Sequence, residues 1–455
     1  MQKRDREPIR LSDHFTYGKL IRFVIPSVCM MIFTSIYSVV DGFFVSNFVG
    51  KTPFAAVNLI MPLLMIFGAV GFMMGAGGNA IVGKTLGEGD VPRANRYFSL
   101  FIYVTGAVGA LFALIGIVFM RPLAGMLGAE GEILSYCVVY GRIILCALPF
   151  FMLQNMFGAF FITAEKPQLG LYMTVLSGVL NMVLDALLVA GCSLGIVGAA
   201  LATAISQVVG GGAALLYFAC PNTGLLRLCS LHAPDGTSQR YLRILAQACI
   251  NGSSEMVSNI AMSVVGIVYN FQLMHYIGED GIAAYGVIMY VSFIFIAVYI
   301  GYSMGIAPVV SYHFGAQNRE ELRNLRLKSL FLVGMTGIAM LVSSQLLTEP
   351  LSSFYVGYDA ALCDLTVHAF RIFNLSYILS GFSIFISSFF TALNDGVTSA
   401  VISFLRTFVF QIAAVLLLPL FFELEGIWWS VIVSELASAV ISVFCLVRGR
   451  RRFGY

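Results

Sequence analysis

Apolar residues dominate the chain in long runs, which short polar segments separate. A helix needs about 20 mostly apolar residues to cross a bilayer. The fifth and sixth runs are separated only by the segment GCSL, so polar residues and total length decide their division. By this criterion the sequence predicts twelve membrane-spanning helices, at residues 20–46, 54–81, 98–120, 133–162, 169–190, 194–219, 243–274, 282–310, 328–347, 366–392, 398–421 and 427–447.

The composition indicates an integral membrane protein. Of the 455 residues, 59% are hydrophobic and only 11% are charged, whereas soluble domains carry about 25% charged residues. The chain therefore has too few polar side chains to cover a water-facing surface. Its net charge of +3 does not indicate a nucleic-acid partner, because the basic residues lie in short segments beside apolar runs.

The basic residues predict the orientation. Most of the 26 Lys and Arg residues lie in the leader, in alternate loops and in the tail, whereas the opposite loops hold Lys51 and Arg121. Loops rich in Lys and Arg stay in the cytoplasm, so we expect both termini there and an even number of spans. The leader shows no cleavage-site pattern, so the first helix is expected to act as an uncleaved insertion signal.

The two halves of the chain repeat one another. Residues 48–87 align without a gap on residues 276–315, and each half holds six predicted spans. The repeats are therefore parallel, which is typical of transporters whose two lobes move around a central site. We predict an organisation of leader 1–19, first lobe 20–219, cytoplasmic linker 220–242, second lobe 243–447 and basic tail 448–455.

The first span contains a carboxylate within apolar sequence. Asp41 follows Thr34, Tyr37 and Ser38 at helical spacing, so all four lie on one face. A charge at the centre of a membrane helix costs about 2.5–3.5 kcal/mol and usually marks an ion or proton pathway. Pro26 frees a backbone carbonyl one turn before it, which predicts a bend.

Further polar groups lie in the same half. Asn181 and Asp185 are four residues apart in the fifth span, and Asn155, Thr203 and Gln207 add neutral oxygens. Two neighbouring carboxylates do not both ionise readily, so they can share a proton, or they can bind Na⁺ with the neutral oxygens. The alternative is that such groups only hold helices together, which suits single hydroxyls better than carboxylates.

We therefore expect two sets of functional residues in the first lobe. The coupling set comprises Asp41, Asp185, Asn181, Asn155 and Thr203, with Asp41, Asn181 and Asp185 as the candidate Na⁺ ligands. The set expected to line a substrate cleft comprises Thr34, Tyr37, Ser38 and Gln207. No cofactor is expected other than Na⁺ as a coupling ion.

The second lobe opens with the polar series Asn251, Glu255 and Asn259, four residues apart. Glu255 is deep in its helix and is a candidate second protonation site or counter-charge for a cationic substrate. The alternative is a neutral, hydrogen-bonded acid. Asn251 and Asn259 are expected to line the cleft.

Other residue types exclude several functions. Arg142 and Arg371 lie near span ends, where they can reach the interface, whereas Arg406 is deeper and needs an acid or carbonyl partner. The nine cysteines form no CxxC pair and the five histidines form no HExxH motif, so we expect no disulfide, metal centre or membrane enzyme. The glycines of GAVGFMMGAGG are not followed by a Walker lysine, so ATP-driven transport is not expected.

These residues together resemble the multidrug and toxic compound extrusion (MATE) family over essentially the whole chain. The twelve spans, the repeat, GEGD after the second span and GIVGAALATAISQ in the sixth carry the resemblance. Pro26, Asp41, Asn181, Asp185 and Thr203 are similar to the pattern of its DinF-like branch. Another bacterial branch has a glutamate at the position of Glu255 and an acid in the tenth helix, but this sequence has no such acid between residues 368 and 393.

The resemblance implies a secondary antiporter of the bacterial inner membrane that works as a monomer. It would export cationic or amphipathic compounds in exchange for H⁺ or Na⁺, with protonation or Na⁺ binding rearranging the first helix. A lipid or lipid-linked oligosaccharide flippase of the same superfamily is the alternative, although its cavity would be more cationic and only Arg406 is deep here. A channel is disfavoured because the carboxylates cluster in one lobe.

Overall fold

The computed structural model describes residues 9–222, 224–231 and 237–455, and within them the chain is built of helices without strands. The first half comprises α1 (Tyr17–Phe44), the π-helical turn η1 (Val45–Val49), α2 (Lys51–Gly87), α3 (Val91–Met126), α4 (Gly131–Thr163), α5 (Pro167–Asp185), the π-helical turn η2 (Ala186–Gly191) and α6 (Gly195–Ala219). The second half comprises α7 (Thr237–Tyr276), α8 (Glu279–Gly315), α9 (Arg319–Val356), α10 (Ala360–Asn374), α11 (Tyr377–Ala392), α12 (Gly396–Phe404), the π-helical turn η3 (Leu405–Phe410), α13 (Gln411–Leu417) and α14 (Pro419–Phe453).

The all-helical membrane fold is confirmed. Among the described residues, eleven helices are long and apolar enough to cross a membrane, and the pair α10–α11 gives a twelfth. The sequence predicts that pair as one helix, 366–392, but the structure bends it by 46°. The Tyr299 hydroxyl of α8 donates to the Tyr377 carbonyl at the start of α11 (2.8 Å), which holds the segment just after the break against α8. In contrast, α1 continues through Pro26 as one helix.

The predicted leader and linker are only partly described. Residues 1–8 of the leader, with Lys3, Arg4 and Arg6, lie outside the described residues, as do residues 223 and 232–236 of the linker, with His232. Residues 9–16 and the C-terminal residues lie at one end of the bundle, because Phe15 contacts Glu321 and Tyr455 contacts Arg326, both in the first turns of α9. We call this the terminal end.

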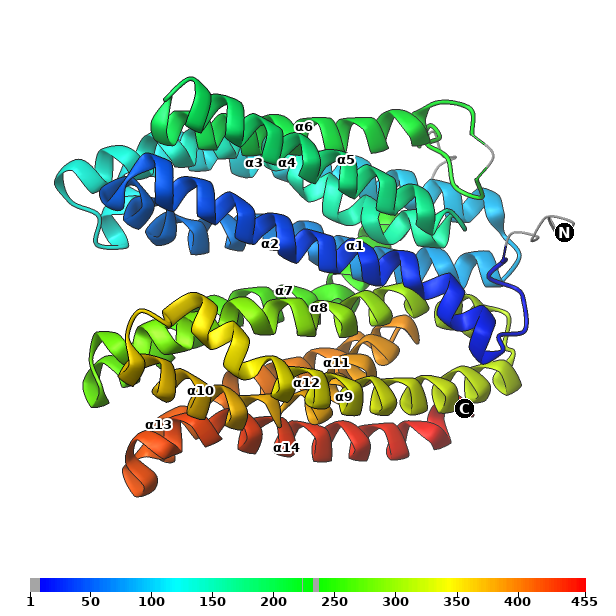
Figure 1. Cartoon of the computed structure of the whole chain (residues 1–455). Helices are drawn as coiled ribbons and strands as arrows, with labels where there is room; N and C mark the ends of the chain where they lie inside the picture. Colours follow the sequence, from blue (N-terminus) through cyan, green and yellow to red (C-terminus); the bar gives the residue numbers. More distant parts are fainter. Residues whose placement is uncertain (1–8, 223, 232–236) are drawn as a thin grey trace, which may run out of the picture.

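The two halves form two lobes that meet along α1, α2, α7 and α8 (Figure 1). Glycines allow the backbones to touch there: a Cβ on Gly252 would overlap the Met73 carbonyl, and a Cβ on Gly77 would overlap the Ala248 carbonyl. Nearer the terminal end, Gly87 and Gly315 lie equally close to the opposite lobe. These two occupy equivalent positions in the sequence repeat, so the seam is closed symmetrically in the terminal half of the molecule.

The residues before α1 connect both lobes at the terminal end. In this N-terminal strap (residues 9–16), Leu11 and Phe15 are fully buried. The Leu11 amide donates to Glu165 between α4 and α5 (2.7 Å), and the Phe15 amide donates to Glu321 of α9 (2.9 Å). Lys328 and Asn324 donate to the Phe15 carbonyl. The strap therefore fastens the first lobe to the second.

The strap makes stability depend on pH through Glu165. Burial raises the pKa of Glu165, although the Leu11 amide and Arg10 oppose this effect. A raised pKa in the folded state means that its contribution to stability is present at low pH and is lost as pH rises through that pKa. We expect the thermal stability of the wild type to fall relative to Glu165→Gln as pH rises from about 4 to 8, measured by melting in detergent. Glu130→Gln, at an exposed glutamate, should show no such divergence; parallel curves for wild type and Glu165→Gln would contradict the prediction.

Candidate functional site

A polar cluster lies inside the first lobe, where α1, α4, α5 and α6 meet. The Asp41 carboxylate near the end of α1 faces Asp185, Thr203 and Asn181. Asp185 is the last residue of α5 and is completely buried, and Asn181, one turn earlier, is 2% exposed. The Asn181 amide donates to the Thr203 hydroxyl of α6 (3.5 Å). The structure therefore brings together four of the six residues predicted to couple ions, and Asn155 and Glu255 lie outside this cluster.

The cluster has more acceptors than donors. Among the described residues, Asp41 Oδ1, Asn181 Oδ1 and both Asp185 carboxylate oxygens are buried without a hydrogen-bond partner. An unsatisfied buried acceptor is costly, and more so when it is charged. A proton shared by the two carboxylates would satisfy them, and so would a cation, because Na⁺ is a hard ion that takes oxygen ligands. The donor set fits either one.

The π-helical turns η1 and η2 lie next to this cluster. The turn η1 follows the last turn of α1, which holds Asp41, and η2 starts immediately after Asp185. Such turns widen a helix by one residue and often occur at functional sites. Here they place both carboxylates at the point where a regular helix ends.

Tyr140 of α4 also lies at this cluster, although it was not among the predicted residues. This residue is completely buried, its hydroxyl has no partner among the described residues, and it interacts electrostatically with both Asp41 and Asp185. No sequence signal distinguishes it from the other nineteen tyrosines, because only the packing of α4 against α5 and α6 brings it to the carboxylates.

The remaining predicted residues of the first lobe lie around the cluster. Tyr37 interacts with Asp41 and packs on Phe33. The side chains of Thr34, Ser38 and Asn155 donate to carbonyls one turn earlier in their own helices. In the described chain Asn155 makes no hydrogen bond to either aspartate, so the structure does not join it to the cluster.

Gln207 and Thr203 line a small cavity between α2, α4 and α6, with a volume of about 30 Å³. The side-chain amide oxygen of Gln207, Oε1, is buried and has no hydrogen-bond partner among the described residues. A space of this size holds about one water molecule. The cavity therefore has room for one water molecule beside Thr203 and Gln207, within otherwise apolar walls.

The second lobe holds a separate charged cluster. Arg406, in the π-helical turn η3, donates two hydrogen bonds to Glu435 of α14 through Nε and Nη2 (3.0 and 2.8 Å). Glu255 of α7 is half-buried and interacts electrostatically with Arg406. Because Arg406 is already paired with Glu435, its charge is not available to neutralise Glu255. Glu435 was not among the predicted functional residues, although it is the only acid within its predicted span, 427–447.

Two predictions for α7 need correction or refinement. Asn251 is 1% exposed, accepts from the Gly396 amide (3.1 Å) and donates to Asn394 (2.8 Å). It therefore fixes the α11–α12 turn and does not line a cleft. Asn259 is half-buried and donates to the Glu255 carbonyl (2.8 Å) in its own helix.

The other predicted arginines behave as their positions suggest. Arg371 pairs with Glu349 (2.5 Å) and both side chains are exposed. Arg142 is exposed and donates to the Ile117 carbonyl (3.2 Å). Neither reaches the buried clusters.

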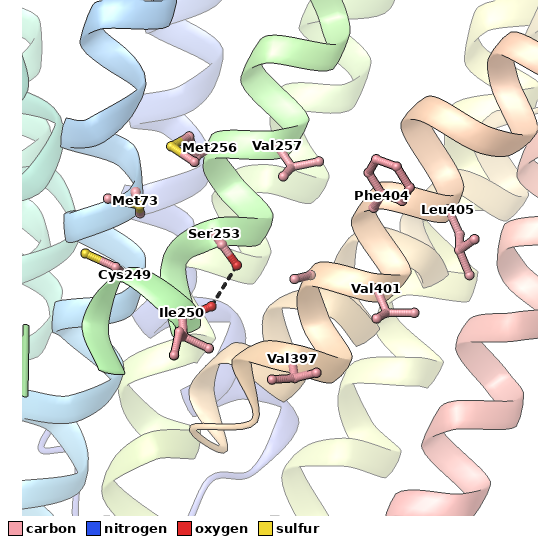
Figure 2. A pocket seen from close by; sticks show the side chains of 11 residues that line it. Met73, Cys249, Ile250, Ser253, Met256, Val257, Val397, Val401, Phe404 and Leu405 are labelled. Atoms are coloured by element: carbon pink, nitrogen blue, oxygen red, sulfur yellow. Dashed lines mark hydrogen bonds between the residues drawn. The ribbon is translucent and has the colours of Figure 1, made fainter. Parts of the chain in front are cut away.

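A second, larger pocket lies elsewhere. It has a volume of about 750 Å³ and lies between α2, α7 and α12 (Figure 2). None of the carboxylates described above lines it. This pocket is therefore distinct from the candidate coupling site.

Comparisons with known proteins agree with this architecture. The MatE family model matches residues 26–187 and 256–417, once in each lobe. The protein named "Multidrug export protein MepA" of Staphylococcus haemolyticus is 24% identical over 99% of this chain and 97% of its own. Its namesake from Staphylococcus saprophyticus is 24% identical over 95% of this chain and 94% of its own.

Solved structures share the fold. An outward-facing multidrug resistance MATE family transporter of the MOP superfamily has a TM-score of 0.90 at 20% identity, covering 99% of this chain and 98% of that one. A MOP superfamily transporter from Pyrococcus furiosus, described as having a binding pocket of reverse polarity, has a TM-score of 0.89 at 21% identity with the same coverage.

Proposed function

The chain belongs to the MatE family, and from that premise we propose that it exports cationic or amphipathic small molecules in exchange for H⁺ or Na⁺. It is a multi-pass membrane transporter and not an enzyme. Export would proceed by alternating access of the two lobes, in a monomer of the bacterial inner membrane. The curated relatives named as multidrug export proteins support this substrate class.

One observation carries the proposal: the buried Asp41–Asp185 pair with its unsatisfied oxygens. A fixed structural pair would be satisfied by a basic residue or by donors. In this cluster the missing partner is a small cation, which can arrive and leave. Because Asp41 lies on α1 and α1 packs on α8 of the other lobe, occupancy of the cluster can change how the lobes meet.

The charges at the terminal end support an orientation in the membrane, and the closed seam supports a conformational state. Basic residues gather at the terminal end, which supports a cytoplasmic location for this end. The glycine contacts of Gly77, Gly87, Gly252 and Gly315 close the terminal half, as in a transporter that is open to the outside. The structures of outward-facing relatives are consistent with that arrangement.

A cationic substrate suits the charges of the second lobe. Glu255 has no basic partner of its own, because Arg406 is held by Glu435. It can therefore balance a positive charge on a substrate. The flippase alternative gains no support, since Arg406, the arginine deep in a span, is already paired with Glu435.

The proposal is tested by export of a fluorescent cationic dye from proteoliposomes. Dye movement would be measured under a pH gradient, under a Na⁺ gradient and without either. We expect one gradient to drive export and so identify the ion, and Glu255→Gln to alter dye affinity without removing the response to that gradient. If neither gradient moves any dye, the antiporter proposal fails.

Tyr140→Phe should weaken coupling without unfolding the lobe. The hydroxyl has no hydrogen-bond partner in the described chain, and it interacts electrostatically with both carboxylates, so its removal deletes a group able to donate to them and breaks no existing hydrogen bond. A hydrogen bond of this kind is worth roughly 1 kcal/mol, or about a fivefold change in the ion concentration that half-saturates export. Tyr136→Phe, one turn earlier in α4 and paired with Glu132, is the matched control. Equal ion dependence in the two variants would remove Tyr140 from the coupling site.

A further inference from the structure

An apolar groove runs along the side of the bundle between α2, α7 and α12 (Figure 2). Its volume is about 750 Å³, which lies within the range of small-molecule sites. Its walls include Met73 from α2, Ile250, Ser253 and Val257 from α7, and Val397 and Val401 from α12. The Ser253 hydroxyl donates to the Ile250 carbonyl (2.7 Å), so the groove offers a ligand almost no free polar group.

The groove faces away from the polar interior. Val397 is 64% exposed, Ile250 is 51% exposed and Val401 is 46% exposed. Glu255 lies two residues after Ser253, and at 3.6 residues per turn it points about 200° away around α7. The groove is therefore open to the hydrocarbon that surrounds the protein and is separate from the charged cluster of the second lobe.

The groove lies at the depth of one leaflet. The helix α12 begins at Gly396 at the terminal end, and the groove residues run from Val397 to Leu405. At 1.5 Å per residue these cover roughly the first 14 Å, about half of a hydrocarbon core of roughly 30 Å. The groove thus matches the acyl chains of the leaflet at the terminal end, which the proposed orientation makes the cytoplasmic one.

Positive charge borders the groove at that end. Arg243 is exposed and lies two turns before Ile250 on the same side of α7. Asp395, immediately before α12, is paired with Arg452 (3.0 Å) and leaves no net negative charge there. A basic residue at this level attracts anionic lipid headgroups.

We propose that this groove is a binding site for an anionic phospholipid, with an acyl chain between α7 and α12 and the headgroup at Arg243. The groove borders the seam at Gly252, where α7 touches the Met73 carbonyl of α2. A bound chain would therefore lie against the contact between the lobes. The inference stands on the groove, its depth and its charge, and it does not need the identity of the exported compound.

The test uses the full-length protein in phosphatidylcholine vesicles with phosphatidylglycerol that carries a photoactivatable acyl chain. After illumination, labelled peptides are mapped by mass spectrometry. We expect labelling to concentrate on 249–257 and 397–405 and to be lost in Val401→Trp, which fills the groove. Arg243→Gln should lower labelling by the phosphatidylglycerol probe about fivefold and leave labelling by the matching phosphatidylcholine probe unchanged.

The controls separate this site from ordinary lipid contact. Leu346→Trp changes another exposed apolar position, on α9, and Arg96→Gln removes another exposed arginine, near the start of α3; both should label as the wild type does. Labelling spread evenly over the lipid-facing helices, or unchanged in Val401→Trp, would overturn the proposal. Displacement of the probe by a cationic dye, with no effect of Arg243→Gln, would also overturn it and assign the groove to transported compounds.

Discussion

Asp41→Asn is expected to abolish gradient-driven export while leaving the protein folded and inserted. Asn has nearly the same shape, so packing in α1 is kept, but the cluster loses one of its two carboxylates and with it the ability to bind and release a cation. Coupling between two ligands is typically worth 5–150-fold in affinity, and its loss should lower gradient-driven export by at least about tenfold. The measurement is dye export from proteoliposomes at matched protein levels.

The aspartate pair gives this prediction internal controls. Asp185→Asn should produce the same loss, and the double variant should be no worse than either single variant, because residues of one network do not act additively. Asp364→Asn makes the same chemical change at an exposed aspartate of α10 and should export normally. Full gradient-driven export by Asp41→Asn, with loss in Glu255→Gln, would move the coupling site to the second lobe.

Gly252→Val is expected to prevent the terminal half of the seam from closing, and so to stop export. A Cβ at this position would overlap the Met73 carbonyl of α2, and backbone cannot move aside as a flexible side chain can. Overpacking of this kind costs about 1–3 kcal/mol or more, which is enough to depopulate the closed arrangement. The lobes themselves remain intact, so the protein should still insert and accumulate.

The matched control lies in the same helix. A Cβ on Gly266 would meet no atom within 4 Å, so Gly266→Val should export normally. The state of the seam can be followed in a cysteine-free background with Ser311→Cys, since Ser311 is completely buried and faces Gly83 across the seam. A membrane-impermeant maleimide added at the terminal end should label this cysteine faster in Gly252→Val. Unchanged labelling and normal export would show that closure does not need this contact.

Much of the fold could be predicted from the sequence, because spans and repeats are local or periodic signals. The cluster of Asp41, Asn181, Asp185 and Thr203 was predictable for a related reason: polar groups are rare in membrane helices and must meet one another. Tyr140 became apparent only in the structure, because tyrosines are common in this chain and only helix packing brings this one to the carboxylates. Glu435 did have a sequence signal, as an isolated acid in an apolar span, but its pairing with Arg406 became apparent only in the structure. The polar residues of α7 show that spacing along a helix does not determine which contacts a side chain makes. It places Asn251 and Glu255 near one face, but the loop packed on that face decides that Asn251 holds a turn.

The strap was beyond sequence reasoning for a further reason. Its bonds run from backbone amides to Glu165 and Glu321, which lie 154 and 306 residues away in sequence. No side-chain pattern in a short polar leader signals such contacts.

The long sequence distance between the strap and Glu321 affects how the protein assembles during its synthesis. Glu321 is made some 300 residues after residues 9–16, which at 5–20 residues per second is roughly 15–60 s later. Throughout that interval Leu11 and Phe15 have no completed site in which to be buried. The strap is thus made long before it can dock fully, and a nascent chain that stalls before α9 cannot complete its assembly.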